Sequence, residues 1–300
     1  MSVGQWDFSP LGYREWPINS MRWIEGNQDN CHVQANQPIN DVQAVSIIDA
    51  QIPFTFYTID KYHNLLWMRE RTTSNPNPSG SYTVVTITPG NYTSQTIGPA
   101  LLSAFTAGGL TGTYTVTFNV STGTLTIVST NRYFDILFAN SKYAYQCTTP
   151  IGFDPYTQAN VINVQSITTP HCIQMSGPTS LLLRGTLGLG TADSMVLCDD
   201  GELANIGGVL CQIPVNCAPG NTINFTNNGP RGGFFSCSSS VLRDGWFWLT
   251  SGDDDLPITL NGGAFTFRLG MLVRSTESQS VNNMGYGGAS SFGGPRGSLR

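Results

Sequence analysis

Residues 114–128 read YTVTFNVSTGTLTIV, and this stretch decides the fold class. Its first half alternates the apolar residues Tyr114, Val116 and Phe118 with threonine and asparagine, so one face of an extended chain is apolar. The Ser-Thr-Gly triplet at 121–123 is a turn signal, and a second alternating run follows it. The stretch is therefore predicted to be a β-hairpin with one buried face.

A compact module surrounds this hairpin in residues 82–140. A strand over residues 82–88 precedes a helix that Thr93 or Ser94 can cap, and a further strand over residues 133–138 closes the module. The apolar positions of the helix recur four apart before it ends near residue 107: Ile97, Leu101 and Phe105. The sequence predicts a strand, helix, hairpin and strand module.

The rest of the chain is predicted to be β-structure. Before the module, residues 41–58 and 61–71 are rich in β-branched and aromatic side chains. After it, the predicted strands are 161–167, 180–183, 208–213, 222–225, 246–250 and 264–273. The 33 glycines and 17 prolines punctuate these runs, as expected for many short strands joined by turns. The predicted fold class is mainly β.

The composition limits the possible partners. The 300 residues are 40% hydrophobic, enough for a core, but only 11% are charged, against about 25% in average proteins. The net charge of −5 argues against a nucleic-acid clamp, and no run of about 18 apolar residues predicts a membrane span. The N-terminus does not read as a secretory signal. A surface this poor in charge is expected to be covered by other subunits.

Both ends of the chain differ from the middle. Residues 1–30 are predicted to be an irregular arm in which Trp6, Trp16 and Trp23 stand among prolines and glycines. These tryptophans either strap the protein's own core or dock on a neighbouring subunit, so they are the candidate partner contacts. From Ser275 the chain is rich in serine, asparagine and glycine, and residues 277–300 are predicted to be a flexible tail.

The cysteines and histidines predict no metal site. Seven cysteines, an odd number without framework spacing, indicate free thiols in a reducing compartment. Cys31-His32 and His171-Cys172 are mirror-image pairs, but adjacent residues on a strand point to opposite faces. Each pair therefore offers only one ligand easily, and neither predicts zinc.

No catalytic or cofactor-binding residue is predicted, and the chain is expected not to be an enzyme. The acidic runs at 199–202 and 253–255 lack the ligand pattern of a calcium loop and are predicted to be solvated loops. Trp246 and Trp248 share one face of a strand and are predicted to lie in the core. The alternative is a carbohydrate-binding β-sandwich that displays these two rings.

Six short motifs follow one another along residues 45–273: IPFTFY (52–57), ITPGNY (87–92), TGTLTI (122–127), IGF (151–153), CQIPV (211–215) and ITLNG (258–262). In sequence and order they resemble motifs of the penton and minor capsid proteins of virophages, polinton-like viruses and nucleocytoplasmic large DNA viruses. The resemblance implies a single jelly-roll β-sandwich over residues 31–276, with the 82–140 module inserted or appended.

The resemblance also implies a role. It implies a structural protein of the virion, with the penton at the five-fold vertex of an icosahedral double-stranded DNA virus as the first expectation. The expected partners are further copies of the chain in a homopentamer, major capsid protein capsomers and other minor capsid proteins. Assembly is expected in the host cytoplasm or virus factory. The alternative within this class is a minor capsid protein that bridges or cements capsomers.

Overall fold

The structure, a computed structural model, describes residues 11–74, 82–138, 149–153, 160–187, 195–197, 203–205, 208–227, 234–236 and 241–274. Several features singled out in the sequence lie outside these residues: Trp6, Cys147, Cys198, Cys237, the acidic run 199–202 and the tail 277–300. None of the helices within the described residues has the length and hydropathy needed to cross a membrane.

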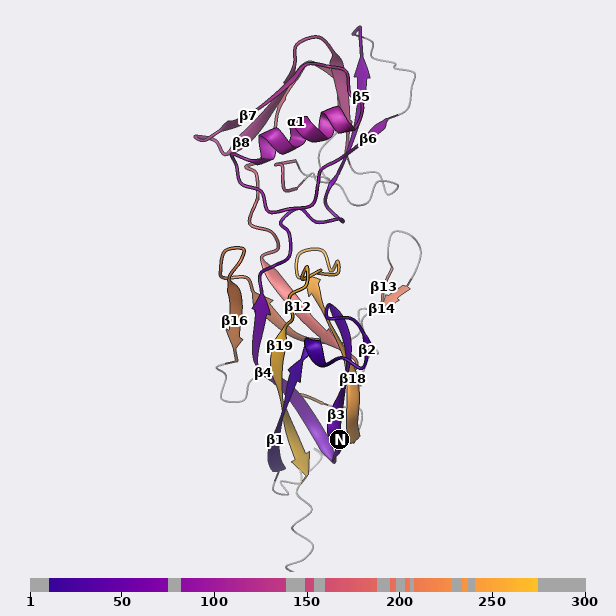
Figure 1. Ribbon diagram of the computed structural model, residues 1–300, viewed down its shortest axis with the longest axis vertical. Helices are drawn as coiled ribbons and strands as arrows, with labels where there is room; N and C mark the ends of the chain where they lie inside the picture. The colour runs from indigo at the N-terminus through magenta and orange to yellow at the C-terminus, as the bar shows by residue number, and fades with distance from the viewer. Residues whose placement is uncertain are drawn as a thin grey trace, which may run out of the picture.

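Two antiparallel sheets face each other in the lower half of the molecule as Figure 1 shows it. The first sheet has the order β1 (Leu11–Asn19), β19 (Thr266–Arg274), β4 (Val42–Pro53) and β16 (Thr222–Thr226), with β17 (Phe235–Ser236) also paired to β4. The second has the order β15 (Val209–Pro214), β12 (Ser180–Gly185), β18 (Val241–Ser251), β3 (Asn30–Asn40) and β2 (Glu25–Gly26). A short 3-10 helix, η1 (Ser20–Arg22), links β1 to β2.

The strand pairings of this sandwich are nested. Strand β1 pairs with β19, β3 with β18, β4 with β16 and β12 with β15, all antiparallel. A long hairpin rolled into two sheets gives this nesting, and it is the topology of a jelly roll. The mainly β fold class and the jelly-roll sandwich predicted from the sequence are therefore confirmed.

The core of the jelly roll lies between the two sheets. Along β19, Phe267, Leu269 and Met271 point inward and are buried, as their alternation predicts. Phe247 of β18 meets them from the opposite sheet, with its ring centroid 5.0 Å from that of Phe267. Burial of this apolar surface is the main term that holds the sheets together.

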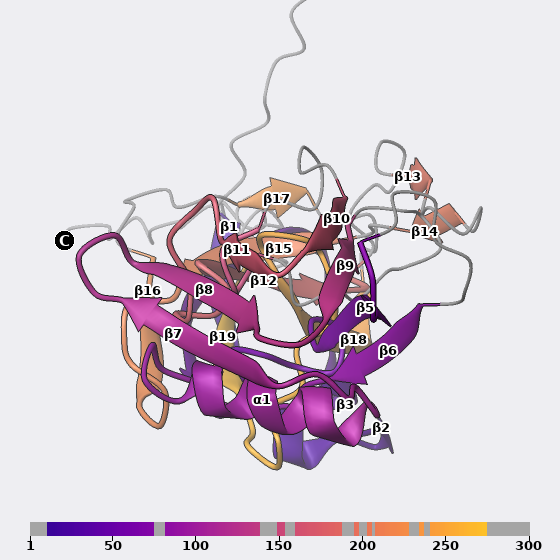
Figure 2. The ribbon, with the colours of Figure 1, turned by 90° about the horizontal axis from the view of Figure 1, so that it is seen from above.

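A second unit is inserted between β4 and β12 and occupies the upper half of Figure 1. One of its sheets has the order β10 (Val161–Val164), β9 (Tyr133–Leu137), β5 (Leu65–Arg71) and β6 (Thr83–Thr86). The other has the order β11 (Ser166–Thr168), β8 (Thr124–Ser129) and β7 (Tyr114–Asn119). Helix α1 (Ile97–Ala107) contacts β6 and β7, and Figure 2 shows it lying alongside the hairpin.

The hairpin and the helix form as the sequence predicts, although the helix starts later. Strands β7 and β8 pair in register from Tyr114↔Ser129 to Asn119↔Thr124. The helix begins at Ile97 because Thr93 first forms a turn, in which its hydroxyl accepts from the backbone N–H of Thr96 at 3.3 Å.

The inserted unit has a core of its own. Its buried cluster, from Ile59 to Val161, shares no residue with the buried cluster of the sandwich. The two chain segments that join the units lie side by side, since a Cβ atom added at Gly177 would meet Thr58 Cγ2 at 3.5 Å. The predicted 82–140 module is therefore part of a larger insertion in one jelly-roll connection, which runs from β5 to β11 and contributes no strand to the roll.

The predicted irregular arm differs from the structure. Residues Leu11–Asn19 form β1, an edge strand of the first sheet, paired with β19 along its whole length. Trp16 points inward, is 8% exposed, and contacts Phe247 edge-on at 6.2 Å between ring centroids. Trp16 is thus a core residue of its own chain and is not exposed for a partner, whereas Trp23 is 46% exposed.

A buried ion-pair cluster supports the inserted unit. Asp135 of β9 is fully buried and accepts hydrogen bonds from Arg69 Nε and Nη2, at 3.0 and 2.8 Å. Arg71 Nη2 and the backbone N–H of Asn163 donate to its other oxygen. The direct pairing of Arg69 with Asp135 across β5 and β9 brings these charges together.

Candidate functional site

The outward face of β18 carries two tryptophans. Phe247 and Leu249 point into the core, so Trp246 and Trp248 point outward, and both are half-buried. The prediction that these tryptophans lie in the core was wrong. Two residues that stand two positions apart on a strand share one face, but this spacing does not say which face is buried. In β18 the buried face is that of Phe247 and Leu249.

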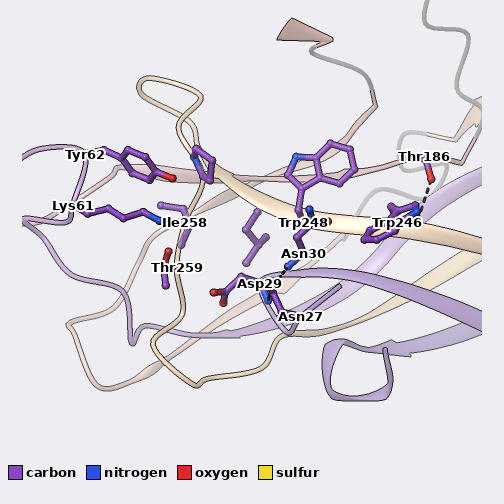
Figure 3. A pocket seen from close by; sticks show the side chains of 12 residues that line it. Asn27, Asp29, Asn30, Lys61, Tyr62, Thr186, Trp246, Trp248, Ile258 and Thr259 are labelled. Carbon is purple, nitrogen blue, oxygen red and sulfur yellow. Dashed lines mark hydrogen bonds between the residues drawn. The ribbon is translucent and has the colours of Figure 1, made fainter. Parts of the chain in front are cut away.

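An open cleft of about 620 Å³ lies beside these rings. Leu249 and Ile258 contribute to its lining, and Figure 3 shows Lys61, Tyr62 and Thr259 across from Trp248. The remaining lining residues are Asn27, Asp29, Asn30, Thr186, Trp246 and Pro257. The cleft is thus built from the β2–β3 turn, strand β18, the loop before β19, and the segment that leads into the inserted unit.

The β2–β3 turn forms one wall and is well ordered by its own hydrogen bonds. Asn27 Oδ1 accepts from the backbone N–H groups of Asp29 and Asn30, at 2.9 and 3.0 Å. Asp29 Oδ1 accepts from the backbone N–H of Leu260 at 2.9 Å, which ties the turn to the opposite loop. Gly26 has a φ of +92°, and a Cβ there would lie 2.9 Å from the Trp246 ring, so glycine is needed at this turn.

His63 joins the inserted unit to the sandwich next to the cleft. Its Nδ1 lies 2.9 Å from Asp60 Oδ1, within the same loop. Its Nε2 lies 2.7 Å from Asp254 Oδ2, in the loop between β18 and β19. An imidazolium can donate from both ring nitrogens, so the charged form of His63 satisfies both carboxylates at once.

The electrostatics of this bridge favour its charged form. Burial alone lowers the pKa of His63, but the hydrogen bonds to Asp254 and Asp60 outweigh it and raise the pKa to about 9. For Asp254, burial raises the pKa, because it disfavours the charged carboxylate. The hydrogen bonds from His63 and Ser251 outweigh this effect and hold the pKa of Asp254 below its usual range. No spacing in the sequence predicts this bridge, because Asp254 lies far from His63 and Asp60 along the chain.

The acidic run 253–255 is an exposed loop, as the sequence predicts, but its carboxylates also bind other parts of the protein. Asp253 accepts from the backbone N–H of Thr179 at 2.9 Å, Asp254 binds His63, and Asp255 accepts from Arg184 Nη2 at 2.6 Å. Arg184 is only 3% exposed, so the loop folds over this charge and neutralises it. Each carboxylate therefore anchors the loop to a different part of the protein.

The Cys31-His32 pair lies on β3 and is separated as strand geometry predicts, whereas the His171-Cys172 pair does not lie on a strand. Cys31 points into the core, where burial raises the pKa of its thiol to about 11. His32 points outward and stacks on Trp246, with ring centroids 4.9 Å apart. His171 and Cys172 are exposed in a loop. Over the part of the chain that the structure describes, no three or more histidine, cysteine, aspartate or glutamate residues gather to hold a metal ion.

Two of the sequence motifs meet beside this site. Phe54 and Phe56 of the IPFTFY motif stack inside the core with ring centroids 4.2 Å apart. Between them, the Thr55 hydroxyl donates to the carbonyl oxygen of Leu260 in the ITLNG motif. Asn261 Nδ2 donates in return to the carbonyl oxygen of Thr55 at 2.7 Å. The motifs thus fix the junction end of the jelly roll.

Comparisons with known proteins give three results. A search of curated proteins finds no match. Among solved structures, the crystal structure of a selenomethionine-labelled mavirus penton protein is similar, with a TM-score of 0.45 and 10% sequence identity, over 88% of this chain and 99% of that chain. A family model described as a family of unknown function, DUF5901, matches residues 27–239, which span most of the jelly roll and the whole insertion. The chain belongs to this family, DUF5901.

Proposed function

We propose that this chain is a structural subunit of a virion, the penton at the five-fold vertex of an icosahedral capsid. The observation that carries the proposal is a complete jelly roll with a surface unusually poor in charge. The six sequence motifs that resemble capsid proteins support the same role. Its partners are then further copies of the chain and the neighbouring capsomers.

An exposed apolar strip supports self-association. Met21, Trp23 and Ile24 follow one another between β1 and β2 and are 61%, 46% and 57% exposed. Leu11 and Tyr13 of the neighbouring edge strand are also about half exposed. Large exposed apolar side chains grouped along one segment mark interaction sites more often than free surface. In the proposed ring, the strip is buried against the next subunit.

The mass of the purified chain in solution tests the proposal. Native mass spectrometry should detect a closed ring with five times the 32.4 kDa mass of one chain. The double variant Met21→Ser and Trp23→Ser should shift the ring toward monomers, because it removes apolar area from the strip. Val120→Ser is the matched control: Val120 is 84% exposed in the inserted unit, away from the strip.

One result would contradict the penton role, and a second would contradict the part that the strip plays in it. A chain that stays monomeric at high concentration, and that sediments together with purified capsomers, favours the minor capsid protein that bridges capsomers. If the double variant leaves the mass of the ring unchanged, the strip does not lie in the interface between subunits. In both cases the jelly roll itself would remain intact by circular dichroism.

A further inference from the structure

We propose that the cleft beside Trp248 binds a saccharide, with a neutral pyranose ring stacked on the outward face of the Trp248 indole. The inference goes beyond the structural role proposed above and does not depend on it, because the cleft lies within a single chain. Its volume of about 620 Å³ falls within the range of roughly 300–1,000 Å³ typical of small-molecule sites.

Trp248 is the ring that is available for stacking. Its neighbours across the sheet are Asn30 on β3 and Arg184 on β12, and the residue is partly exposed at the cleft. Trp246 is less suited, because His32 covers one of its faces at an interplanar angle of 6°. A pyranose ring has a face of C–H bonds that packs on an aromatic ring, while its hydroxyl groups point to the rim.

The rim of the cleft offers the hydrogen-bonding groups that sugar hydroxyls need. The Asn30 side-chain amide and the Thr259 hydroxyl line the cleft, and neither makes a side-chain hydrogen bond with another described residue. Asp29 uses Oδ1 to hold Leu260, which leaves Oδ2 as an acceptor at the rim. Amide, hydroxyl and carboxylate groups beside one aromatic ring match a polyhydroxylated ligand better than a purely apolar one.

The walls of the cleft are held in place before any ligand arrives. The Asn27 turn fixes Asp29 and Asn30, and the His63–Asp254 bridge fixes the segment that carries Lys61 and Tyr62. Lys61 Nζ lies 4.8 Å from the centroid of the Tyr62 ring, so both side chains form one surface. A preformed site loses less entropy on binding, which favours even a small ligand.

Saturation-transfer NMR on the purified full-length chain tests the inference. The probes are the methyl glycosides of glucose, galactose, mannose and N-acetylglucosamine, with sialyllactose as a charged sugar. At least one neutral glycoside should bind with a Kd in the range of about 1 mM, typical of a single-ring contact. Trp248→Ala should weaken that binding about tenfold or more, and Asn30→Ala about two- to tenfold.

Val120→Ala is the matched control, since it shortens an exposed apolar side chain of the inserted unit that does not line the cleft, and it should leave the Kd unchanged. If Trp248→Ala fails to fold, Asn30→Ala and Thr259→Ala carry the test. Equal signals from wild type and all cleft variants would overturn the inference, as would the absence of binding by every glycoside. If Trp248→Ala instead breaks the oligomer and no glycoside binds, the cleft is an interface between subunits. These outcomes are separate from the mass measurement that tests the penton role.

Discussion

His63 shows how a single side chain can couple two separately folded units. It sits on the segment leading into the insertion, and Asp254 sits on a loop of the sandwich. The imidazole is about 29% exposed, so solvent screens the bridge only in part. Because two carboxylates share one cation, loss of the proton leaves two negative groups facing a neutral ring.

The stability that His63 contributes should depend on pH. Its pKa is raised in the folded state from about 6.5 to about 9, so its contribution is fully present below pH 6.5 and is lost as the pH rises through 9. His63→Gln should lower the free energy of unfolding by roughly 2–3 kcal/mol at pH 6 and by little at pH 10. Urea unfolding of both proteins across this range measures the difference.

The exposed His171 provides the control for this experiment. His171→Gln should change the free energy of unfolding little at either pH, because this residue is exposed to solvent. The difference in free energy of unfolding between wild type and His63→Gln should shrink as the pH rises. If it stays constant or grows toward high pH, the bridge is not charged as the geometry indicates.

Asp135 is the residue on which the charge balance of the inserted unit depends. Asp135→Ala removes the carboxylate that Arg69 and Arg71 share inside the unit. The two guanidinium groups then remain away from water without their negative partner, which is costly. The free energy of unfolding should fall by about 3–5 kcal/mol. Asp49→Ala is the control, because Asp49 pairs with Arg268 on the surface and should have a much smaller effect. Similar losses for both variants would contradict the buried role.

At the scale of elements, β1 completes the first sheet. Its inward residues Trp16 and Ile18 are buried, whereas Leu11 and Tyr13 remain outside. Among the strands that the structure describes, β1 lies at a sheet edge, so its other side can pair with a partner strand. The same short strand therefore contributes to the core on one face and presents side chains to the surroundings on the other.

Two substitutions on β1 separate these roles. Trp16→Ala should lower the free energy of unfolding by about 3–5 kcal/mol, because it leaves a cavity between the sheets. Tyr13→Ala should lower it by less than about 1 kcal/mol, since this ring is half exposed. Thermal and urea unfolding measure both. If Trp16→Ala altered only assembly, residues 11–19 would be a docking arm after all.

Strands with a clean alternation were predictable from the sequence, and polar or edge strands were not. The hairpin β7–β8 and strand β19 have one apolar face each, so their period alone identifies them. Strand β3 was missed because most of its residues are polar and Pro38 interrupts it. What holds β3 in the sheet is its pairing with β18, a long-range contact that no local pattern reports.

The candidate site was only partly predictable for the same reason. The period of β18 placed Trp246 and Trp248 on one face, but only the packing of Phe247 against Trp16 decides which face is buried. The bridge between His63 and Asp254 joins loops that meet only after both units have folded. Such junctions depend on tertiary contacts between distant residues, so no short stretch of the sequence predicts them.

At the scale of the whole molecule, the two cores should be separable. Replacing residues 59–176 with a short glycine linker should leave a sandwich that unfolds cooperatively, because its buried cluster contains no residue from this range. Thr58 and Gly177 are already neighbours, so the linker spans little distance. Near-ultraviolet circular dichroism and urea unfolding check the result. A product without fixed tertiary packing would show that the insertion supports the roll.

The nested pairing of the strands has a consequence for the order in which the molecule can form during synthesis. Strand β1 leaves the ribosome first, yet its hydrogen-bonding partner is β19, whose last residue is Arg274. All the strands of the inserted unit lie between Leu65 and Thr168, so that unit can fold on the nascent chain while β1 still waits. The early, unpaired edge must therefore stay soluble until β19 has been synthesised, which leaves it exposed to chaperones and to aggregation in the meantime.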